Sequence, residues 1–245
     1  MTAPATIPAA ASPATDPRHA TLEDSWLFLH AATLAGEEGR AWADAFTRGP
    51  YLEGLTRVQA VLVTLRKGDF EAGRREVQDL EKELDHVDVD PSHRLVFERF
   101  YSGALAYLRF IERDFDGAVA ALERGENAAV EVMDQHPFLV SLAIVFSDFT
   151  VQRARVARNR RDWDRLRELL ETARGMVTGR RPLCTLSNGE PIFSKHLATF
   201  FDEIAVSQQD RLSVEKFKNP EVLWGRLETQ VYQIPVPSGF VVPFQ

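Results

Sequence analysis

Cysteine is almost absent from this chain of 245 residues, which holds a single one, Cys184. That count excludes an internal disulfide and a zinc site built from several cysteines. The chain also lacks the HExxH, GxSxG, GxGxxG and Walker patterns of common hydrolytic, dinucleotide-binding and phosphate-binding sites. We therefore expect no catalytic residue and no cofactor, and an enzyme is only the alternative interpretation.

Long apolar runs are absent as well. The longest one, residues 138–146, is interrupted by Ser141 and is far shorter than the roughly 20 residues that a membrane-spanning helix needs. The net charge of -7 does not favour attraction to nucleic acid or to an anionic membrane. Since the N-terminus also lacks the basic and apolar regions of a secretory signal, we expect a cytoplasmic protein without membrane or nucleic-acid partners.

The two ends of the chain differ in composition from its middle. Residues 1–19 contain four prolines and no apolar periodicity, which predicts a disordered tail. Residues 234–245 contain three prolines and several large apolar residues, which predicts an extended apolar tail. This second tail either packs on the chain's own last helices or docks on another subunit as a homo-oligomer contact. Residues 20–233 between them are expected to form a single helical-repeat domain.

Apolar residues recur at helical spacing through this middle region. Asp90-Pro91 and Asn219-Pro220 add start signals, because Asp or Asn caps a helix and Pro fits its first position. Residues 178–191 are expected to be an irregular connection with a turn at 187–189. The predicted helices cover residues 21–35, 36–48, 51–66, 71–84, 91–111, 115–133, 138–158, 164–177, 192–206 and 221–232.

Three of the connections between helices carry Asp, then an aromatic residue, then an acid. They are Asp69-Phe70-Glu71, Asp114-Phe115-Asp116 and Asp162-Trp163-Asp164. Their aromatic residues are 45 and 48 positions apart, a spacing typical of an array of helix pairs. The expected fold class is therefore all-α, with antiparallel helical hairpins stacked side by side.

The turns at Gly68 and Arg113 and the small residues around them resemble the tetratricopeptide repeat family, over about residues 51–176. That family joins two antiparallel helices by a turn of Gly-Asp-aromatic type and keeps small residues where helices approach closely. Residues at those places here are Gly73, Ala106, Ala118, Gly125, Ala154 and Ala173. The alternative is an irregular helical bundle in which Asp-aromatic turns recur by chance.

The resemblance implies a short solenoid whose first helices line a groove that binds a partner protein or peptide. Carried over by position, the groove-facing residues of the central and third hairpins are Phe100, Tyr107, Phe110, Asp148, Arg155, Arg158 and Asn159. Their aromatic and cationic side chains favour a partner with an acidic segment. The function expected is thus a non-catalytic scaffold or adaptor.

Arginine is concentrated between residues 153 and 181, which contain ten Arg, no Lys and four acids. Because guanidinium groups bind carboxylates and phosphates bidentately, this cluster could hold an acidic or phosphorylated partner, a small anion or a nucleotide. In the alternative interpretation, these are solvated helix faces paired with the chain's own acids. Besides Arg155 and Arg158, the anion-binding candidates are Arg153, Arg160, Arg161, Arg165, Arg180 and Arg181.

Two further segments hold residues of chemical interest. Residues 85–93 (DHVDVDPSH) contain several Asp and His residues of the kind that bind metals. However, the positions that an EF-hand loop fills with Gly and Glu hold His93 and Arg99. Helix capping by Asp90 explains the acids, so no metal is expected.

Cys184 and His196 are the only Cys and His close in sequence. If the protein is instead an enzyme or a small-ligand binder, its site is expected in a pocket under the loop 180–190.

Overall fold

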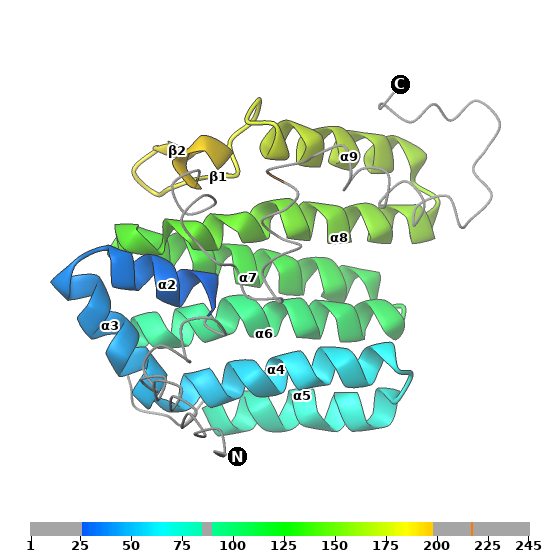
Figure 1. Ribbon diagram of the computed structural model, residues 1–245. Coiled ribbons are helices and arrows are strands. Elements are labelled where there is room, and N and C mark those ends of the chain that lie inside the picture. Colours follow the sequence, from blue (N-terminus) through cyan, green and yellow to red (C-terminus); the bar gives the residue numbers. More distant parts are fainter. Residues whose placement is uncertain (1–25, 85–89, 198–216, 218–245) are drawn as a thin grey trace, which may run out of the picture.

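The computed structural model describes residues 26–84, 90–197 and 217. Within them the chain is all-α apart from one short hairpin, which confirms the expected fold class (Figure 1). The tails predicted at 1–19 and 234–245, the helix predicted at 221–232 and most of the helix predicted at 192–206 lie outside the described residues. Of the described helices, none is long and apolar enough to cross a membrane.

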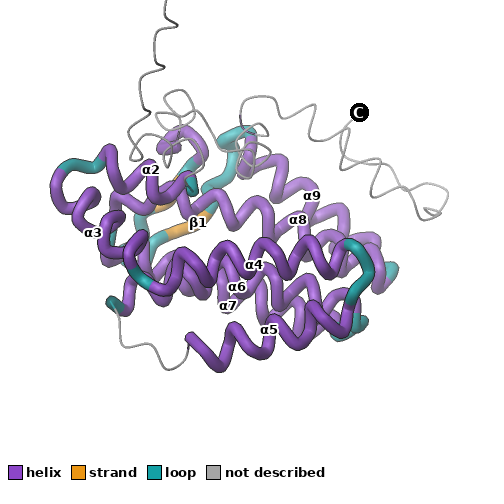
Figure 2. The backbone as a smooth tube through the Cα atoms, turned by 60° about the horizontal axis from the view of Figure 1, so that its bottom comes forward, coloured by secondary structure: helices purple, strands orange, loops and turns teal. Residues whose placement is uncertain are grey.

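The helices follow one another as antiparallel pairs. Three hairpins, α4–α5, α6–α7 and α8–α9, stack in chain order (Figure 1). Helices α2 and α3 lie beside the stack, at the helix ends opposite the turns of the three hairpins. Figure 2 shows the same stack as a tube, with the loops of the three hairpins gathered at one end. The α-helices are α2 (Leu27–Leu34), α3 (Glu37–Arg48), α4 (Pro50–Arg66), α5 (Phe70–Leu84), α6 (Pro91–Ile111), α7 (Phe115–Gln135), α8 (Ile144–Arg160) and α9 (Trp163–Val177).

The loops of the three hairpins share one backbone geometry. In each, the residue before the Asp has a positive φ, and the Asp N–H donates to the carbonyl five residues earlier, which closes the preceding helix as a Schellman motif. The positive-φ residues are Gly68 at 90°, Arg113 at 62° and Arg161 at 60°. The three closing hydrogen bonds run from Asp69 to Thr64, from Asp114 to Arg109 and from Asp162 to Ala157.

The Asp of each turn also starts the next helix. Its carboxylate accepts a hydrogen bond from the backbone N–H three residues later, which satisfies a donor that the helix itself leaves unpaired. These N–H groups belong to Ala72 at 3.2 Å, Gly117 at 2.9 Å and Arg165 at 3.1 Å. One Asp therefore ends one helix and begins its partner, which explains why the turn needs no additional residues.

Small residues let neighbouring helices approach closely, as expected. A Cβ atom placed on Gly125 of α7 would lie 2.8 Å from the Phe149 ring and 2.8 Å from the Ser102 Cβ. A Cβ atom on Gly73 of α5 would collide with the Leu65 side chain of α4. Contacts this short are incompatible with a side chain, so these two glycines set the distances between their helices.

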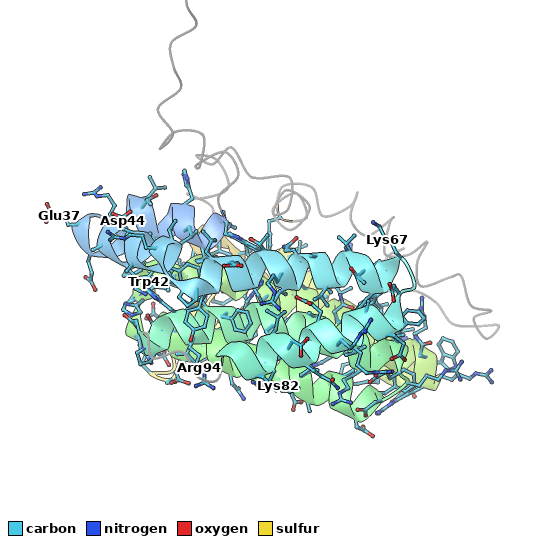
Figure 3. All side chains as sticks on the ribbon, turned by 90° about the horizontal axis from the view of Figure 1, so that it is seen from below. Glu37, Trp42, Asp44, Lys67, Lys82 and Arg94 are labelled. Carbon is cyan, nitrogen blue, oxygen red and sulfur yellow. The ribbon has the colours of Figure 1, made fainter. Side chains whose placement is uncertain are left out.

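The N-terminal pair α2–α3 is held to the hairpins by a hydrogen-bonded chain. The Trp42 Nε1 donates to the Ser92 hydroxyl at 2.7 Å, and this hydroxyl donates to the Asp90 carboxylate at 2.6 Å. Asp90 caps α6 as predicted, accepting from the Ser92 N–H at 2.8 Å. Figure 3 places Trp42 of α3 and Arg94 of α6 toward one end of the long helices and Lys67, next to the α4–α5 turn, at the other.

The helix predicted at 138–158 is wrong in its first third. Residues Pro137–Ala143 form a 3₁₀ helix, η1, with a non-helical backbone at Leu139, and α8 begins only at Ile144. Leu139, Leu142 and Ala143 are buried, and η1 packs against both α2 and α7. The apolar run predicted burial correctly, but it did not predict the 3₁₀ conformation.

The predicted connection at 178–191 contains a two-stranded hairpin. Strand β1 (Cys184–Thr185) pairs antiparallel with β2 (Pro191–Ile192) around the predicted turn, and η2 (Ser194–Leu197) follows. The helix predicted from Ile192 is therefore wrong over its described part. The backbone of Ile192 is occupied by sheet pairing, since the Leu183 N–H donates to its carbonyl at 2.6 Å.

Candidate functional site

A groove of about 590 Å³ runs between α4, α6 and α8, the first helices of the three hairpins. Helix α2 and η1 contribute the remaining wall. The helix residues that line it are Val58, Gln59, Leu62 and Arg66 on α4, Arg99, Phe100, Gly103 and Tyr107 on α6, and Ile144, Asp148, Phe149, Gln152 and Arg155 on α8. The size lies within the range of pockets that hold small ligands or a few residues of a peptide.

Residues at one equivalent position of the three hairpins all line the groove. Leu62, Tyr107 and Arg155 each lie six residues before the positive-φ residue of their turn, and all three line the groove. Side chains at equivalent positions of parallel stacked helices point to the same side of the stack. The same position thus supplies an apolar, an aromatic and a cationic side chain in succession.

One end of the groove is aromatic and is closed by α2. The Trp26 ring lies 4.7 Å from the Phe100 ring in an edge-to-face arrangement, and the Phe28 ring lies 5.6 Å from it. The Arg99 guanidinium lies 3.8 Å from the Phe100 centroid. Phe100 therefore lies within an aromatic cluster instead of projecting freely toward a partner.

The other end of the groove is cationic. Arg66 and Arg155 lie at this end, whereas Arg99 lies at the aromatic end. The lining of the whole groove holds these three arginines against one acid, Asp148, so three positive charges less one negative charge leave +2. Burial lowers the pKa of Arg155, and the nearby Arg158 and Arg66 lower it further, while Tyr107 and Asp148 oppose this shift. Positive charge gathered in a half-buried cleft attracts an anion more strongly than the same charge on an open surface.

Four of the seven predicted partner-binding residues come together here: Phe100, Tyr107, Asp148 and Arg155 line one groove. Phe110 lines a neighbouring cavity of only about 10 Å³ together with Tyr107, and its ring lies 5.8 Å from that of Phe115.

The remaining two predicted residues do not line the groove. Arg158 is half-buried on α8, close enough to Arg155 to lower its pKa. Asn159 is exposed, and its amide donates to the Arg155 carbonyl at 2.8 Å.

The structure does not gather the six anion-binding candidates into one site. Three of them pair with acids of the chain itself, as the alternative interpretation expects: Arg153 with Glu126 at 2.5 Å, Arg160 with Asp116 at 2.6 Å and Arg165 with Glu168 at 2.6 Å. The other three are exposed: Arg161 forms the third turn, Arg180 donates to Thr178, and Arg181 donates to Thr172.

Sequence reasoning missed Arg66, Arg99 and Ser141 in the groove wall. Ser141 is 4% exposed, and its hydroxyl has no hydrogen-bond partner within the described part of the chain. The repeated register could have predicted Leu62 from Tyr107 and Arg155. No local signal predicts Ser141, because η1 reaches the groove only through its packing against α2.

The loop 180–190 forms the β1–β2 hairpin, and its residues line neither the groove nor the smaller cavity. Its backbone is held by a hydrogen bond from the Ser187 N–H to Asp134 at 3.2 Å. Burial, together with Asp134 and Glu126, raises the pKa of the Cys184 thiol to about 12. Such a thiol is protonated at neutral pH and is a poor nucleophile.

Among the residues that the structure describes, no group of three or more His, Cys, Asp or Glu side chains could hold a metal ion. Asp90 serves as the cap of α6, and His93 is buried against Trp42 and Phe46, with ring centroids 4.9 and 5.2 Å apart. Residues 85–89 of the acidic segment lie outside the described part.

No protein-family model matches the chain, and neither a curated protein nor a solved structure matches it significantly.

Proposed function

We propose that this protein is a non-catalytic binding protein that holds an acidic segment of a partner protein in the groove between α4, α6 and α8. The observation that carries the proposal is the charge of the groove. Its lining sums to +2 within a chain of -7, and Arg155 is half-buried there. An acidic protein that concentrates arginine in a cleft attracts an anion to that cleft and repels it elsewhere.

The side chains of the groove suit a carboxylate ligand. The Arg155 Nη1 donates to the Gln152 Oε1 at 3.0 Å, a contact that orients the guanidinium. Guanidinium groups can donate two parallel hydrogen bonds to a carboxylate, and Tyr107 adds an aromatic surface with a hydroxyl. Apolar contacts with Leu62 and Ile144 would supplement these polar ones.

We also propose that the three hairpins are tetratricopeptide-like. The repeated Asp-aromatic turn, the small residues at Gly73 and Gly125 and the groove on the first helices support this assignment. In such an array the groove is a surface for recognition, and it needs no catalytic group.

The test is binding of a fluorescein-labelled hexaglutamate peptide, measured by fluorescence anisotropy at low salt. We expect saturable binding that Arg155→Gln or Arg66→Gln weakens about tenfold each. Arg165→Gln removes the same charge from the exposed face of α9 and should leave the affinity unchanged. Equal affinity of the Arg155→Gln and Arg165→Gln proteins would refute the groove as the site.

The size of the groove supports a second candidate, a small anion or nucleotide. About 590 Å³ is enough for a ligand of that size. Thermal melting with separate nucleotides and organic acids distinguishes the two. A rise in melting temperature with one such compound, abolished by Arg155→Gln, would favour the small ligand over the peptide.

A further inference from the structure

We infer that mildly acidic pH detaches the α2–α3 pair from the three hairpins through protonation of His93, and that the groove thereby loses its aromatic end. The inference goes beyond the proposed function, because it concerns a wall of the groove and not the ligand. It rests on the surroundings of His93, on the aromatic rings that link His93 to Phe100, and on the way in which α2 and α3 are attached.

His93 lies in the contact between α6 and α3. The residue is 4% exposed, and its ring centroid lies 4.9 Å from that of Trp42 and 5.2 Å from that of Phe46, both on α3. Its Nε2 atom is buried and has no hydrogen-bond partner within the described part of the chain. Protonation of Nε2 would place a charged N–H donor where no described group accepts it, and a buried charge without a partner is costly.

The groups around His93 act on its charge in opposite directions. Burial is the largest influence and lowers the pKa of His93. Among the described residues, His136 after α7 lowers this pKa further, whereas Asp90 before α6 and a hydrogen bond with the Trp42 backbone of α3 raise it. The attached α2–α3 pair therefore favours the neutral form of His93.

A continuous series of aromatic rings connects His93 to the groove. The Phe46 ring that packs against His93 lies 5.3 Å from the ring of Phe28 on α2. The Phe28 ring in turn lies 5.6 Å from that of Phe100 in the groove wall. Because closely packed side chains transmit displacements to one another, we expect α2 to leave Phe100 when α3 leaves His93.

Helices α2 and α3 are attached less firmly than the hairpins are to one another. They have 8 and 12 residues, whereas α4 to α9 have 15 to 21 residues each. In the described residues no side chain caps the N-terminus of α2 or α3, but Asp90, Asp114 and Asp162 cap α6, α7 and α9. The pair also lies beside the stack, so the hairpins remain packed without it (Figure 1). Segments of this kind open at a lower free energy than the whole fold.

The direction of the pH effect follows from the two states of His93. Detachment exposes the ring, and its pKa returns to the ordinary value of about 6.5. Between this value and the lower pKa of the attached state, the detached state binds more protons, so its population rises as pH falls. One histidine can raise the ratio of detached to attached molecules by up to about tenfold between pH 7.5 and pH 5.5.

The experiment is hydrogen exchange of the full chain at pH 7.5 and 5.5, followed by mass spectrometry, with times scaled for intrinsic exchange. We expect the protection of residues 27–48 to fall about fivefold at pH 5.5, while residues 144–177 of α8 and α9 keep theirs. His93→Phe retains an aromatic ring and should abolish the fall. His196→Gln changes an exposed histidine and should leave it intact.

The loss of the groove wall has its own measurement. Benzoylphenylalanine in place of Trp26 should attach to α6 near Phe100 at pH 7.5 and about fivefold less at pH 5.5. Attachment that is equal at the two pH values would overturn the inference.

Three results of the exchange experiment would also overturn it. One is unchanged protection of residues 27–48 at pH 5.5, and another is an equal loss in residues 144–177, which would mean that acid unfolds the whole chain. Both are read on the natural chain and need no variant. The third is an undiminished fall in the His93→Phe protein. None of these measurements uses hexaglutamate, so the inference and the proposed function can fail independently.

Discussion

Arg113 and Arg161 adopt a left-handed backbone conformation at the turns of the second and third hairpins. A residue with a Cβ atom adopts this conformation at a cost of about 1 kcal/mol, which glycine avoids. The first turn has Gly68 at the equivalent position, with φ of 90°. The Gly68 turn therefore shows the same backbone conformation without a Cβ atom, and the turns at Arg113 and Arg161 can be compared with it.

We predict that Arg113→Gly and Arg161→Gly each raise the free energy of unfolding by about 0.5–1 kcal/mol, as measured by urea denaturation. Gly68→Ala should lower it by about 1 kcal/mol. Since no atom lies within 4 Å of a Cβ built on Gly68, that loss would reflect backbone strain alone. Destabilisation by both Arg→Gly changes would show that the arginine side chains outweigh the strain.

Two glycines on the facing helices α6 and α7 differ sharply in the space beside them. A Cβ on Gly125 would lie 2.8 Å from both Phe149 and Ser102, whereas a Cβ on Gly103 would make an ordinary contact of 3.5 Å with Phe149. We predict that Gly125→Ala lowers the free energy of unfolding by about 1–3 kcal/mol through overpacking. Gly103→Ala is the matched control.

Because alanine favours helix over glycine, Gly103→Ala should be neutral or stabilising by up to about 1 kcal/mol. Thermal or urea denaturation of the two variants side by side makes the comparison. Equal destabilisation of both would mean that helix propensity and local space do not govern these positions.

At the scale of secondary-structure elements, α7 and α8 are joined by a bidentate ion pair. The Arg153 Nη1 and Nη2 donate to the Glu126 carboxylate at 2.5 and 2.6 Å, and the two side chains are 15% and 16% exposed. Arg153 was a candidate for anion binding, but this pairing gives it a structural role.

We predict that Arg153→Ala and Glu126→Ala each lower the free energy of unfolding by about 2 kcal/mol, because each leaves a partly buried charge unpaired. The double variant should lose less than the sum of the two. Hexaglutamate binding should be unchanged for Arg153→Ala. A loss of binding as large as that of Arg155→Gln would instead place Arg153 in the site.

The start of α6 contains a buried histidine that makes stability depend on pH. Burial lowers the pKa of His93, and His136 adds to this shift while the Asp90 carboxylate opposes it. The unfolded chain takes up a proton near the ordinary pKa of about 6.5, whereas folded His93 does so only at lower pH. Between these two values the unfolded state binds more protons, so stability falls as pH falls.

Melting temperatures between pH 5 and 8 test this prediction. His93→Phe preserves an aromatic ring beside Trp42 and should flatten the profile below pH 6.5. His196→Gln changes an exposed histidine and should preserve the profile of the natural chain. An unchanged decline in the His93→Phe protein would assign the pH dependence to other groups.

Most boundaries of α4 to α9 could be predicted because local signals mark them. Asp90 with Pro91 starts α6, and the Asp-aromatic turns end one helix and start the next. η1 could not be predicted, since an apolar run indicates burial but not which kind of helix forms. The β1–β2 pairing was missed because two-residue strands carry too little pattern to be recognised.

At the scale of the whole molecule, the groove depends on contacts between distant parts of the sequence. The repeated register placed Tyr107 and Arg155 together correctly, because equivalent positions of stacked helices share a face. The aromatic end was missed, since it requires Trp26, the N-cap residue of α2, and Phe28 of α2 to reach Phe100 of α6. Likewise, the arginine-rich segment looked like one site in the sequence, but of its ten arginines only Arg155 lines the groove.

The most direct test of the central claim is to locate a bound acidic peptide on the protein. A hexaglutamate peptide carrying one photo-crosslinking benzoylphenylalanine is irradiated with the full chain, and the attachment sites are mapped by mass spectrometry. If the peptide binds in the groove, we expect attachment within residues 99–107 of α6 and 144–155 of α8. This attachment should be reduced in the Arg155→Gln protein and retained in the Arg165→Gln protein. Attachment mainly within residues 160–181 would contradict the account, because it would place the ligand on the exposed arginines of α9 and the loop after it.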